Sequence, residues 1–300
     1  MSNWDKEYLN LCKKILNDGK LVRNRTGIDC MKVPSHHFHF DLQKEFPVLT
    51  TKQLFFRQAI LEMLWIYQVQ SNDVRWLKDR NVHIWDEWEI DENGKWHATQ
   101  NEFYKNGKIR KVEVEKDFGK EWAHTIGTAY GYIVKKFGLI DNLIEKLKNN
   151  PNDRRMVMSL WQDDYLDTAV LPSCVWSTEW DVTDGKLNAW VHQRSCDVPL
   201  GLPFNVTQYA TLLCMLAKTT GLEPGSIDWS IKDAHIYVNQ IDGVKEQIKR
   251  YEHLGDYPAP TLWLNPEVKN FYDYDNSENI KDVKILNYKH HGKISFPIAK

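Results

Sequence analysis

The sequence predicts a mixed α/β or α+β protein with a mainly β centre. Helical and strand-like patterns are interspersed without regular alternation, and strand-like segments dominate residues 155–198. The chain of 300 residues contains no internal repeat and no low-complexity linker. We therefore expect a single domain over residues 1–300, with an exposed insertion at about 91–120 that is rich in Asn, Gly, Lys and Glu.

Four segments have the apolar spacing of helices. Residues 4–18 are amphipathic, and residues 51–70 are apolar nearly all round, which is typical of a buried helix. Residues 140–151 form an amphipathic pattern that stops at Asn-Asn-Pro. Residues 203–221 have proline near the first turn and glycine after the last turn. We expect a helix in each.

Strand patterns occupy most of the remaining chain. The turn signal TDG at 183–185 separates two alternating segments and predicts a β-hairpin. In the insertion, KIRKVEVEK at 108–116 alternates well enough for a short hairpin. The tail 284–300 is expected to be strand and loop. The other predicted strands are 31–42, 155–161, 174–182, 186–198 and 227–239.

Charge and hydropathy exclude several classes of protein. The chain has 39 basic and 41 acidic residues, a net charge of −2, which argues against the basic surface of a nucleic-acid binder. The N-terminal segment lacks the apolar core of a signal peptide, and no apolar run is long enough to span a membrane. We therefore expect a cytoplasmic protein that needs neither DNA nor a membrane.

The five cysteines are odd in number and include no CxxC pair, so neither a disulfide framework nor a metal site is expected. Cys174, in LPSCVW, is either a small buried apolar residue or a nucleophile. Cys196 cannot be ranked against it by composition. Cys214 lies on an apolar helical stripe and is expected to be structural.

Several polar residues each admit two interpretations. Arg194 ends a strand that leads into a helix, which is typical of an anion site, although a solvated arginine on a strand edge is the more common case. Asn205 heads the apolar stripe of the 203–221 helix and could recognise a pyrimidine edge or cap the helix. His235 and Tyr237 share one strand face and could bind a sugar hydroxyl or form a half-buried aromatic pair.

Two further segments are equally ambiguous. DRR at 153–155 and RNRTG at 23–27 could grip a phosphate through arginine forks, or could be solvated surface. NVHIWDEW at 81–88 could form a stacking wall for a heteroaromatic ring, or a loop that anchors the core.

Eight segments, in this order along the chain, resemble the folate-dependent thymidylate synthases that use a cysteine nucleophile. The resemblance covers nearly the whole chain apart from 91–120, and its most specific segment is the thirteen-residue QRSCDVPLGLPFN. The Cys-Val pair at 174–175 and the segment NPEVKNFYDY resemble the branch typified by the Bacillus A-type enzyme. The segments are RTG (25–27), EMLW (62–65), NVHIWDEW (81–88), AYG (129–131), NDRR (152–155), LPSCV (171–175), QRSCDVPLGLPFN (193–205) and DAHIY (233–237).

The resemblance implies a fold and a reaction. The fold is a large mixed β-sheet flanked by helices and packed back-to-back against the same sheet in a homodimer. The reaction is a methyl transfer (EC 2.1.1.45) in which 5,10-methylenetetrahydrofolate, acting as co-substrate without a metal, converts dUMP to dTMP and leaves as dihydrofolate. A dUMP hydroxymethylase on the same fold is the alternative. A nucleic-acid-binding module that has lost catalysis is disfavoured by the balanced charge.

The resemblance also assigns roles to residues. Cys174 adds to C6 of dUMP, and Arg194 lowers the pKa of its thiol. Arg154 and Arg155 reach the phosphate from the partner subunit, and residues 297–300 close over the ligands as a lid. The implied catalytic residues are Cys174, Glu62, Tyr130, Arg194, Asp197 and Asn205. The implied dUMP-binding residues are Arg25, Arg154, Arg155, Arg194, Ser195, Asp197, Asn205, His235 and Tyr237. The implied folate-binding residues are Lys52, Ile84, Trp85, Leu171, Asp197, Leu200, Gly201, Phe204 and Ala299.

Some positions depart from the usual pattern of this family. Val175 replaces the histidine that usually follows the nucleophile, and Ser173 replaces a second proline. Glu179 and Asp181 add two acids on a strand that the resemblance places at the subunit interface. Lys300 replaces an apolar last residue.

Overall fold

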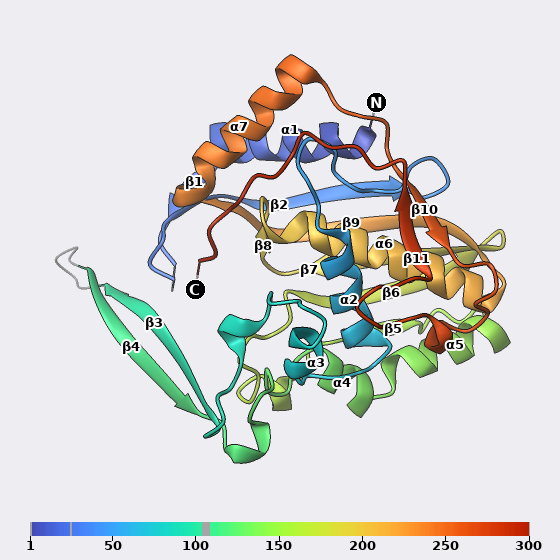
Figure 1. Ribbon diagram of the computed structural model, residues 1–300, viewed down its shortest axis with the longest axis horizontal. Coiled ribbons are helices and arrows are strands. Elements are labelled where there is room, and N and C mark those ends of the chain that lie inside the picture. Colours follow the sequence, from blue (N-terminus) through green and yellow to red (C-terminus); the bar gives the residue numbers. More distant parts are fainter. Residues whose placement is uncertain (1, 25, 104–108, 300) are drawn as a thin grey trace.

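A seven-stranded mixed sheet forms the centre of the molecule (Figure 1). The structure, a computed structural model, describes residues 2–24, 26–103 and 109–299. The strands follow the order β1-β2-β9-β7-β6-β5, and the short β8 pairs with β9. All pairings are antiparallel except β7 with β9 and β8 with β9. The strands are β1 (Lys20–Val22), β2 (Cys30–Asp41), β5 (Val157–Ser159), β6 (Val175–Thr183), β7 (Lys186–Gln193), β8 (Cys196–Asp197) and β9 (Glu223–Tyr237).

The predicted hairpin at TDG joins β6 to β7. Asp184 and Gly185 both have positive φ, 53° and 74°, as the tight hairpin turns that match strand twist require. On β7 the alternation holds as expected: Leu187 and Val191 are fully buried, whereas Trp190 on the opposite face is 47% exposed. The sheet therefore buries one face and leaves large apolar side chains on the other.

The two acids that depart from the family pattern both have neighbours on this hairpin. Glu179 pairs with the ring of His192 at 2.9 Å. Asp181 accepts hydrogen bonds from the Asn188 amide at 3.2 Å and the Thr183 hydroxyl at 2.7 Å. Each carboxylate is thus partnered within its own chain.

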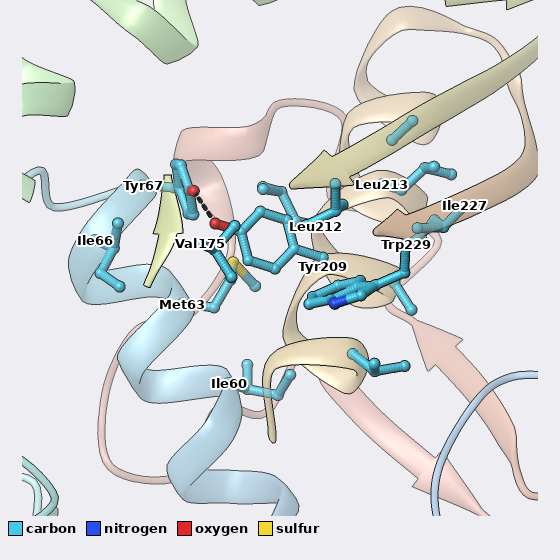
Figure 2. Close-up of a cluster of buried hydrophobic side chains, with 14 of the residues drawn as sticks. Ile60, Met63, Ile66, Tyr67, Val175, Tyr209, Leu212, Leu213, Ile227 and Trp229 are labelled. Carbon is cyan, nitrogen blue, oxygen red and sulfur yellow. Dashed lines mark hydrogen bonds between the residues drawn. The ribbon is translucent and has the colours of Figure 1, made fainter. Parts of the chain in front are cut away.

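Two helices cover the buried face of the sheet and position the site. Helix α2 (Phe56–Tyr67) packs on α6 (Gly201–Thr220), and Figure 2 shows the cluster between them. Tyr67 and Tyr209 share a hydrogen bond of 2.6 Å inside this otherwise apolar cluster. Val175, the residue after the predicted nucleophile, is 3% exposed and belongs to the same cluster. Its apolar side chain therefore stabilises the core next to Cys174.

The predicted helices are confirmed, with adjusted ends. Helix α1 (Asn3–Asp18) and helix α5 (Leu139–Asn149) match their patterns closely. Helix α6 ends at Thr220, and Gly221 after it has a φ of 74°, which suits glycine after a last helical turn. Helix α2 begins at Phe56, later than the expected residue 51, and residues 51–55 are loop. Helices α3 (Arg75–Lys78), α4 (Gly131–Lys136) and α7 (Ile241–Leu254) were not expected.

Two strand predictions need correction. KIRKVEVEK is not a hairpin by itself: it lies almost wholly in one strand, β4 (Ile109–Asp117), which pairs with β3 (Lys95–Phe103). Its alternation is that of a single strand, so the hairpin is about twice as long as predicted and projects from the rest of the molecule (Figure 1). The predicted strand 186–198 is interrupted at residues 194–195, which separate β7 from β8.

The remaining elements are short. In the tail, β11 (Val283–Leu286) pairs with β10 (Thr261–Leu264), and residues 287–299 form no helix or strand. The described part of the chain has no helix long and apolar enough to cross a membrane. Single-turn 3₁₀ helices are η1 (Asp86–Trp88), η2 (Lys120–Trp122), η3 (Asp163–Tyr165), η4 (Val238–Gln240) and η5 (Phe271–Asp273).

Candidate active site

A cavity of about 730 Å³ lies where β8 and β9 end beside the start of α6. This volume is typical of a small-molecule binding site. The cavity brings together residues that are far apart in the sequence, and ten of them were predicted as site residues. These ten are Leu171, Cys174, Arg194, Ser195, Asp197, Leu200, Gly201, His235, Tyr237 and Ala299.

Cys174 is held by its backbone immediately before β6. Its N–H donates to the Tyr130 hydroxyl at 3.1 Å, and its carbonyl accepts from the Arg194 N–H at 2.9 Å. Tyr130 itself has a φ of 46°, a left-handed conformation that is rare for a bulky residue. Cys174 is partly exposed and lines both the main cavity and a smaller one behind it.

Burial separates Cys174 from the other cysteines. Cys196 is 1% exposed, and burial raises the pKa of its thiol well above the ordinary value. Burial also raises the pKa of Cys12 and of Cys214 to about 12. Cys30 lines the main cavity, but it too is buried, and its pKa is raised. The structure therefore favours Cys174 over Cys196 as the nucleophile.

Arg194 clamps the loop that carries Cys174. Its Nε donates to the carbonyl of Ser173 at 3.0 Å, and its Nη2 donates to the carbonyl of Pro172 at 2.6 Å. The guanidinium also lies 5.4 Å from the ring centre of Trp161. The interpretation of Arg194 as an ordinary solvated arginine is therefore wrong.

A cavity of about 30 Å³ lies behind Cys174, between Glu62, Tyr130, Val175 and Asn205. It can hold roughly one water molecule among polar partners. Burial raises the pKa of Glu62, although hydrogen bonds from Gln208 and Trp85 partly oppose the shift. The indole Nε1 of Trp85 donates to Glu62 Oε1 at 2.7 Å. Trp85 therefore contacts Glu62 and does not line the main cavity.

Asn205 lies inside α6, and the helix-capping interpretation is wrong because the N-cap residue is Leu200. Its Oδ1 accepts from Gln193 Nε2 and its Nδ2 donates to Gln208 Oε1, both at 3.2 Å. Gln208 Nε2 in turn donates to Glu62 Oε2, and the indole of Trp229 donates to Gln193 at 3.0 Å. This hydrogen-bonded amide chain fixes which side of Asn205 donates and which accepts.

Asp197 lines the main cavity, and Lys52 is a buried residue near it. Asp197 accepts from the Leu200 N–H at 3.1 Å and from Gln240 Nε2 at 2.8 Å, and burial raises its pKa. Lys52 does not line the cavity: its ammonium donates to the carbonyl of Pro199 and lies 4.8 Å from the ring centre of Phe296. Burial lowers the pKa of Lys52 to about 8.

His235 and Tyr237 reach the cavity from the end of β9, with ring centres 5.0 Å apart. The Nδ1 of His235 is hydrogen-bonded to the Asp233 carboxylate at 3.0 Å. That bond is the largest cause that lowers the pKa of Asp233 to about 2. The other ring nitrogen of His235, Nε2, is the polar atom that can form a hydrogen bond with a ligand.

The remaining predicted residues lie away from the cavity. Arg154 and Arg155 are exposed, and Arg155 pairs with Asp153 at 2.9 Å. Ile84 and Phe204 pack against the core next to the site and do not line the cavity. Arg25 and Lys300 lie outside the described residues. Among the described residues, no three His, Cys, Asp or Glu side chains are grouped so as to hold a metal ion.

The residues at the site that were not predicted from the sequence include two groups. The insertion contributes Trp96, Val114 and Lys116 to the cavity wall, at the base of the β3–β4 hairpin. Gln193, Gln208 and Gln240 hold the polar site residues in place. Gln193 lies in the most specific motif, QRSCDVPLGLPFN, but no residue pattern around Gln208 or Gln240 indicates a role at the site.

Comparisons with known proteins agree with this geometry. The family model described as thymidylate synthase matches residues 6–300. A thymidylate synthase from Clostridium beijerinckii is 46% identical over 299 residues, and thymidylate synthase 1 from Bacillus subtilis is 38% identical over 318 residues; both alignments cover 100% of each chain. The solved structure of thermostable thymidylate synthase A from Bacillus subtilis matches with a TM-score of 0.81 and 38% identity, covering 99% of each chain. The chain therefore belongs to the thymidylate synthase family, as its motifs predicted.

Proposed function

We propose that this protein is a thymidylate synthase, a methyltransferase that converts dUMP to dTMP with 5,10-methylenetetrahydrofolate and releases dihydrofolate. The observation that carries the proposal is the position of Cys174. It lies between a ligand-sized cavity and a small polar cavity that contains Glu62 and Asn205. The large cavity can bind the substrates, and the groups around the small cavity can recognise the uracil base and transfer protons.

Cys174 starts the reaction by adding its sulfur to C6 of dUMP. This addition makes C5 nucleophilic, and the thiolate leaves again at the end, so one difficult step is divided into easier ones. The clamp of Arg194 on residues 172–173 and the bond from Tyr130 hold the cysteine backbone in place. The positive charge of the guanidinium that holds this loop favours the thiolate.

Asn205 selects uracil. Its amide retains one unused N–H and one unused lone pair, because Gln208 and Gln193 occupy the others. The remaining N–H can donate to O4, and the remaining lone pair can accept from N3–H. Cytosine offers an amino group and an unprotonated N3 at these positions, so it would be rejected.

Glu62 moves protons through the small cavity behind Cys174, by way of the single water that this space admits. Its raised pKa brings the carboxyl closer to neutral pH, where a group can both give and take a proton. Tyr130 contributes a hydroxyl at the same place. Valine at 175 leaves this water and these two groups to cover the side where the family usually has histidine.

The remaining groups bind dUMP. Arg194, Ser195 and Arg25 hold the phosphate from the same subunit, and Arg154 and Arg155 reach it from the partner in a homodimer. His235 and Tyr237 hold the 3′-hydroxyl of the sugar. The exposed Trp190 and Val157 on the outer face of the sheet support a sheet-to-sheet dimer, because large exposed apolar patches commonly mark interfaces.

The folate co-substrate supplies the one-carbon unit and the hydride. Leu171, Leu200, Gly201 and Ala299 form apolar walls for it, and the Asp197 carboxylate can accept from N–H groups of its pterin ring. Ile84, Trp85 and Phe204 support these walls from behind. Lys52 fixes the carbonyl of Pro199 below them.

We place the enzyme in the cytoplasm. The five cysteines, all of which are described, form no disulfide, and this supports a reducing compartment.

Product analysis tests the proposal. Purified protein mixed with dUMP and 5,10-methylenetetrahydrofolate is expected to yield dTMP and dihydrofolate in equal amounts, measured by mass spectrometry and by the absorbance of dihydrofolate. Formation of 5-hydroxymethyl-dUMP with tetrahydrofolate would instead identify a hydroxymethylase and overturn the synthase proposal.

A further inference from the structure

One buried amide connects three parts of the site. Gln240, in η4 directly after β9, is 1% exposed. Its Oε1 accepts from the N–H of Tyr237 at 3.1 Å, and its Nε2 donates to Asp197 Oδ2 at 2.8 Å and to the carbonyl of Pro297 at 3.1 Å. Its donors and its acceptor are therefore all used within the protein.

The three partners of Gln240 belong to different functions of the site. Tyr237 lies on the nucleotide side, Asp197 on the folate side, and Pro297 in the C-terminal tail. Ile298 and Ala299, the next two residues of the tail, line the main cavity. The bond to Pro297 therefore holds the tail at the point where it enters the cavity.

Packing brings the tail to the same place. Phe296 lies against Gly243 of α7, where an added Cβ would come within 2.6 Å of the Phe296 ring. The ammonium of Lys52 lies 4.8 Å from the centre of the same ring. These contacts are apolar or weakly directional, so they set the position of residue 296 without fixing the direction of the next carbonyl. Gln240 supplies that direction.

We propose that Gln240 is a positioning residue that ties the C-terminal tail to the folate-side carboxylate and to the nucleotide-binding strand. This inference rests on the proposed function. With the tail held, water is excluded from the cavity while the methylene group is attached to C5 and C6 is still bonded to sulfur. With the tail released, water adds to that methylene carbon, the C6–S bond breaks, and Cys174 regains a proton. The products are then 5-hydroxymethyl-dUMP and tetrahydrofolate, with no net oxidation or reduction.

A matched pair of variants tests this role. Gln240→Met removes all three hydrogen bonds at nearly constant side-chain volume. Gln247→Met removes two hydrogen bonds, with Thr51 and Tyr8, at a second buried glutamine that does not line the cavity and whose bonding partners lie outside the tail. For Gln240→Met we expect the KM for folate to rise about tenfold and the hydroxymethyl fraction of product to rise at least about tenfold, with the affinity for dUMP changed less than about threefold. Gln247→Met is expected to lower stability and to leave the product ratio unchanged.

Hydrogen exchange of the tail gives a readout that needs no turnover. In the full-length protein without substrates, the peptide that covers residues 293–299 should exchange faster in Gln240→Met than in wild type or Gln247→Met. If Gln240→Met fails to fold, Gln240→Glu serves instead, because it keeps the acceptor for Tyr237 and loses both amide donors. A wild-type product ratio together with wild-type tail exchange in the variant that folds would overturn the inference. If wild type itself makes no dTMP, the proposed function fails, and tail exchange still decides whether Gln240 holds the tail.

Discussion

The two sides of Cys174 are built in opposite ways. On the base side, Asn205, Gln208, Gln193 and Glu62 form one continuous hydrogen-bonded chain that two buried indoles complete. On the phosphate side, Arg154 and Arg155 are exposed and line neither of the two cavities beside Cys174. The base side is preorganised within one subunit, whereas the phosphate side is expected to be completed only by a second subunit.

The contrast shows which groups must be ordered before a ligand binds. Buried polar groups need hydrogen-bond partners whether or not a ligand is bound. The side chains of the base side must therefore already be in their final arrangement before dUMP binds. Exposed arginines are solvated by water until a phosphate or a partner replaces it.

The largest effect is expected at the residue between the two sides. Cys174→Ser should lower kcat by about 10⁴-fold or more, because a hydroxyl is a far weaker nucleophile than a thiolate. Binding of dUMP, measured by calorimetry, should persist because both sides remain intact. Cys196→Ala is the control and should keep most activity; the reverse pattern would transfer the nucleophilic role to Cys196.

The base side can be broken at its proton-transfer group. Glu62→Gln should lower kcat by about 10²–10³-fold, the usual contribution of a general acid or base. Because burial raises the pKa of Glu62, the rate of wild type should change with pH above the ordinary range of a carboxylic acid, and the variant should lack that change. Steady-state rates between pH 5 and 8 measure both effects. An unchanged pH profile in the variant would assign the titration to another group.

Base selection tests the orientation of the amide chain. Asn205→Asp cannot donate to Gln208 or to O4 of uracil, so the preference for dUMP over dCMP should fall by about 100-fold. The ratio of kcat/KM values for the two nucleotides is the measurement. If that ratio does not move, Asn205 is not the group that reads the base.

The phosphate side is expected to show sharing between subunits. Arg154→Ala and Arg155→Ala should each raise the KM for dUMP by about tenfold, since a charge-assisted hydrogen bond is lost. A mixture of the double variant with Cys174→Ser should recover about a quarter of wild-type activity, because half of the dimers are mixed and each has one complete site. A mixture that stays inactive would place these arginines outside the shared site.

The last effect concerns stability and not catalysis, and it should come from a buried residue alone. Lys52 titrates at about 8 in the folded protein and near 10.5 when unfolded, so between these values the unfolded chain holds the extra proton. The free energy of unfolding should therefore rise with pH across this window, by about 3 kcal/mol for this group. Subtracting denaturant midpoints of Lys52→Met from those of wild type isolates the effect. The difference between wild type and Arg154→Ala should show no such pH dependence, because both contain Lys52, and a similar slope in the two differences would contradict the contrast.

The sequence predicted most of this architecture wherever the pattern is local. Helices α1, α5 and α6 follow from apolar spacing and end signals, and the Asp184–Gly185 turn follows from backbone chemistry. Helix α7 was missed, although the ion pair between Glu246 and Arg250 has helical spacing and could have indicated it. Only the pairing of β4 with β3 shows that KIRKVEVEK is one long strand, and pairing is not a local property.

The site was predicted less completely, for a similar reason. Motifs identified Cys174, Asp197 and Asn205, because short runs of unusual residues are recognisable without a fold. The amides that hold these residues come from β7, α6 and η4 and have no spacing in common. Their role depends on long-range contacts that the fold alone brings together. Composition alone could not rank Cys174 above Cys196; the resemblance did, and the burial of Cys196 agrees with it.

The pairing of β2 with β9 has a consequence for synthesis of the chain. Cys30 lies opposite Tyr237, and the register continues to Asp41 opposite Ser226. Strand β2 is therefore synthesised roughly two hundred residues before β9, the strand with which it pairs. Contacts this distant in sequence slow folding, because a long loop must close before they can form. An emerging chain therefore cannot assemble the cavity on the ribosome until β9 has left the exit tunnel. Until then the apolar edge of β2 is exposed to the aggregation that chaperones prevent.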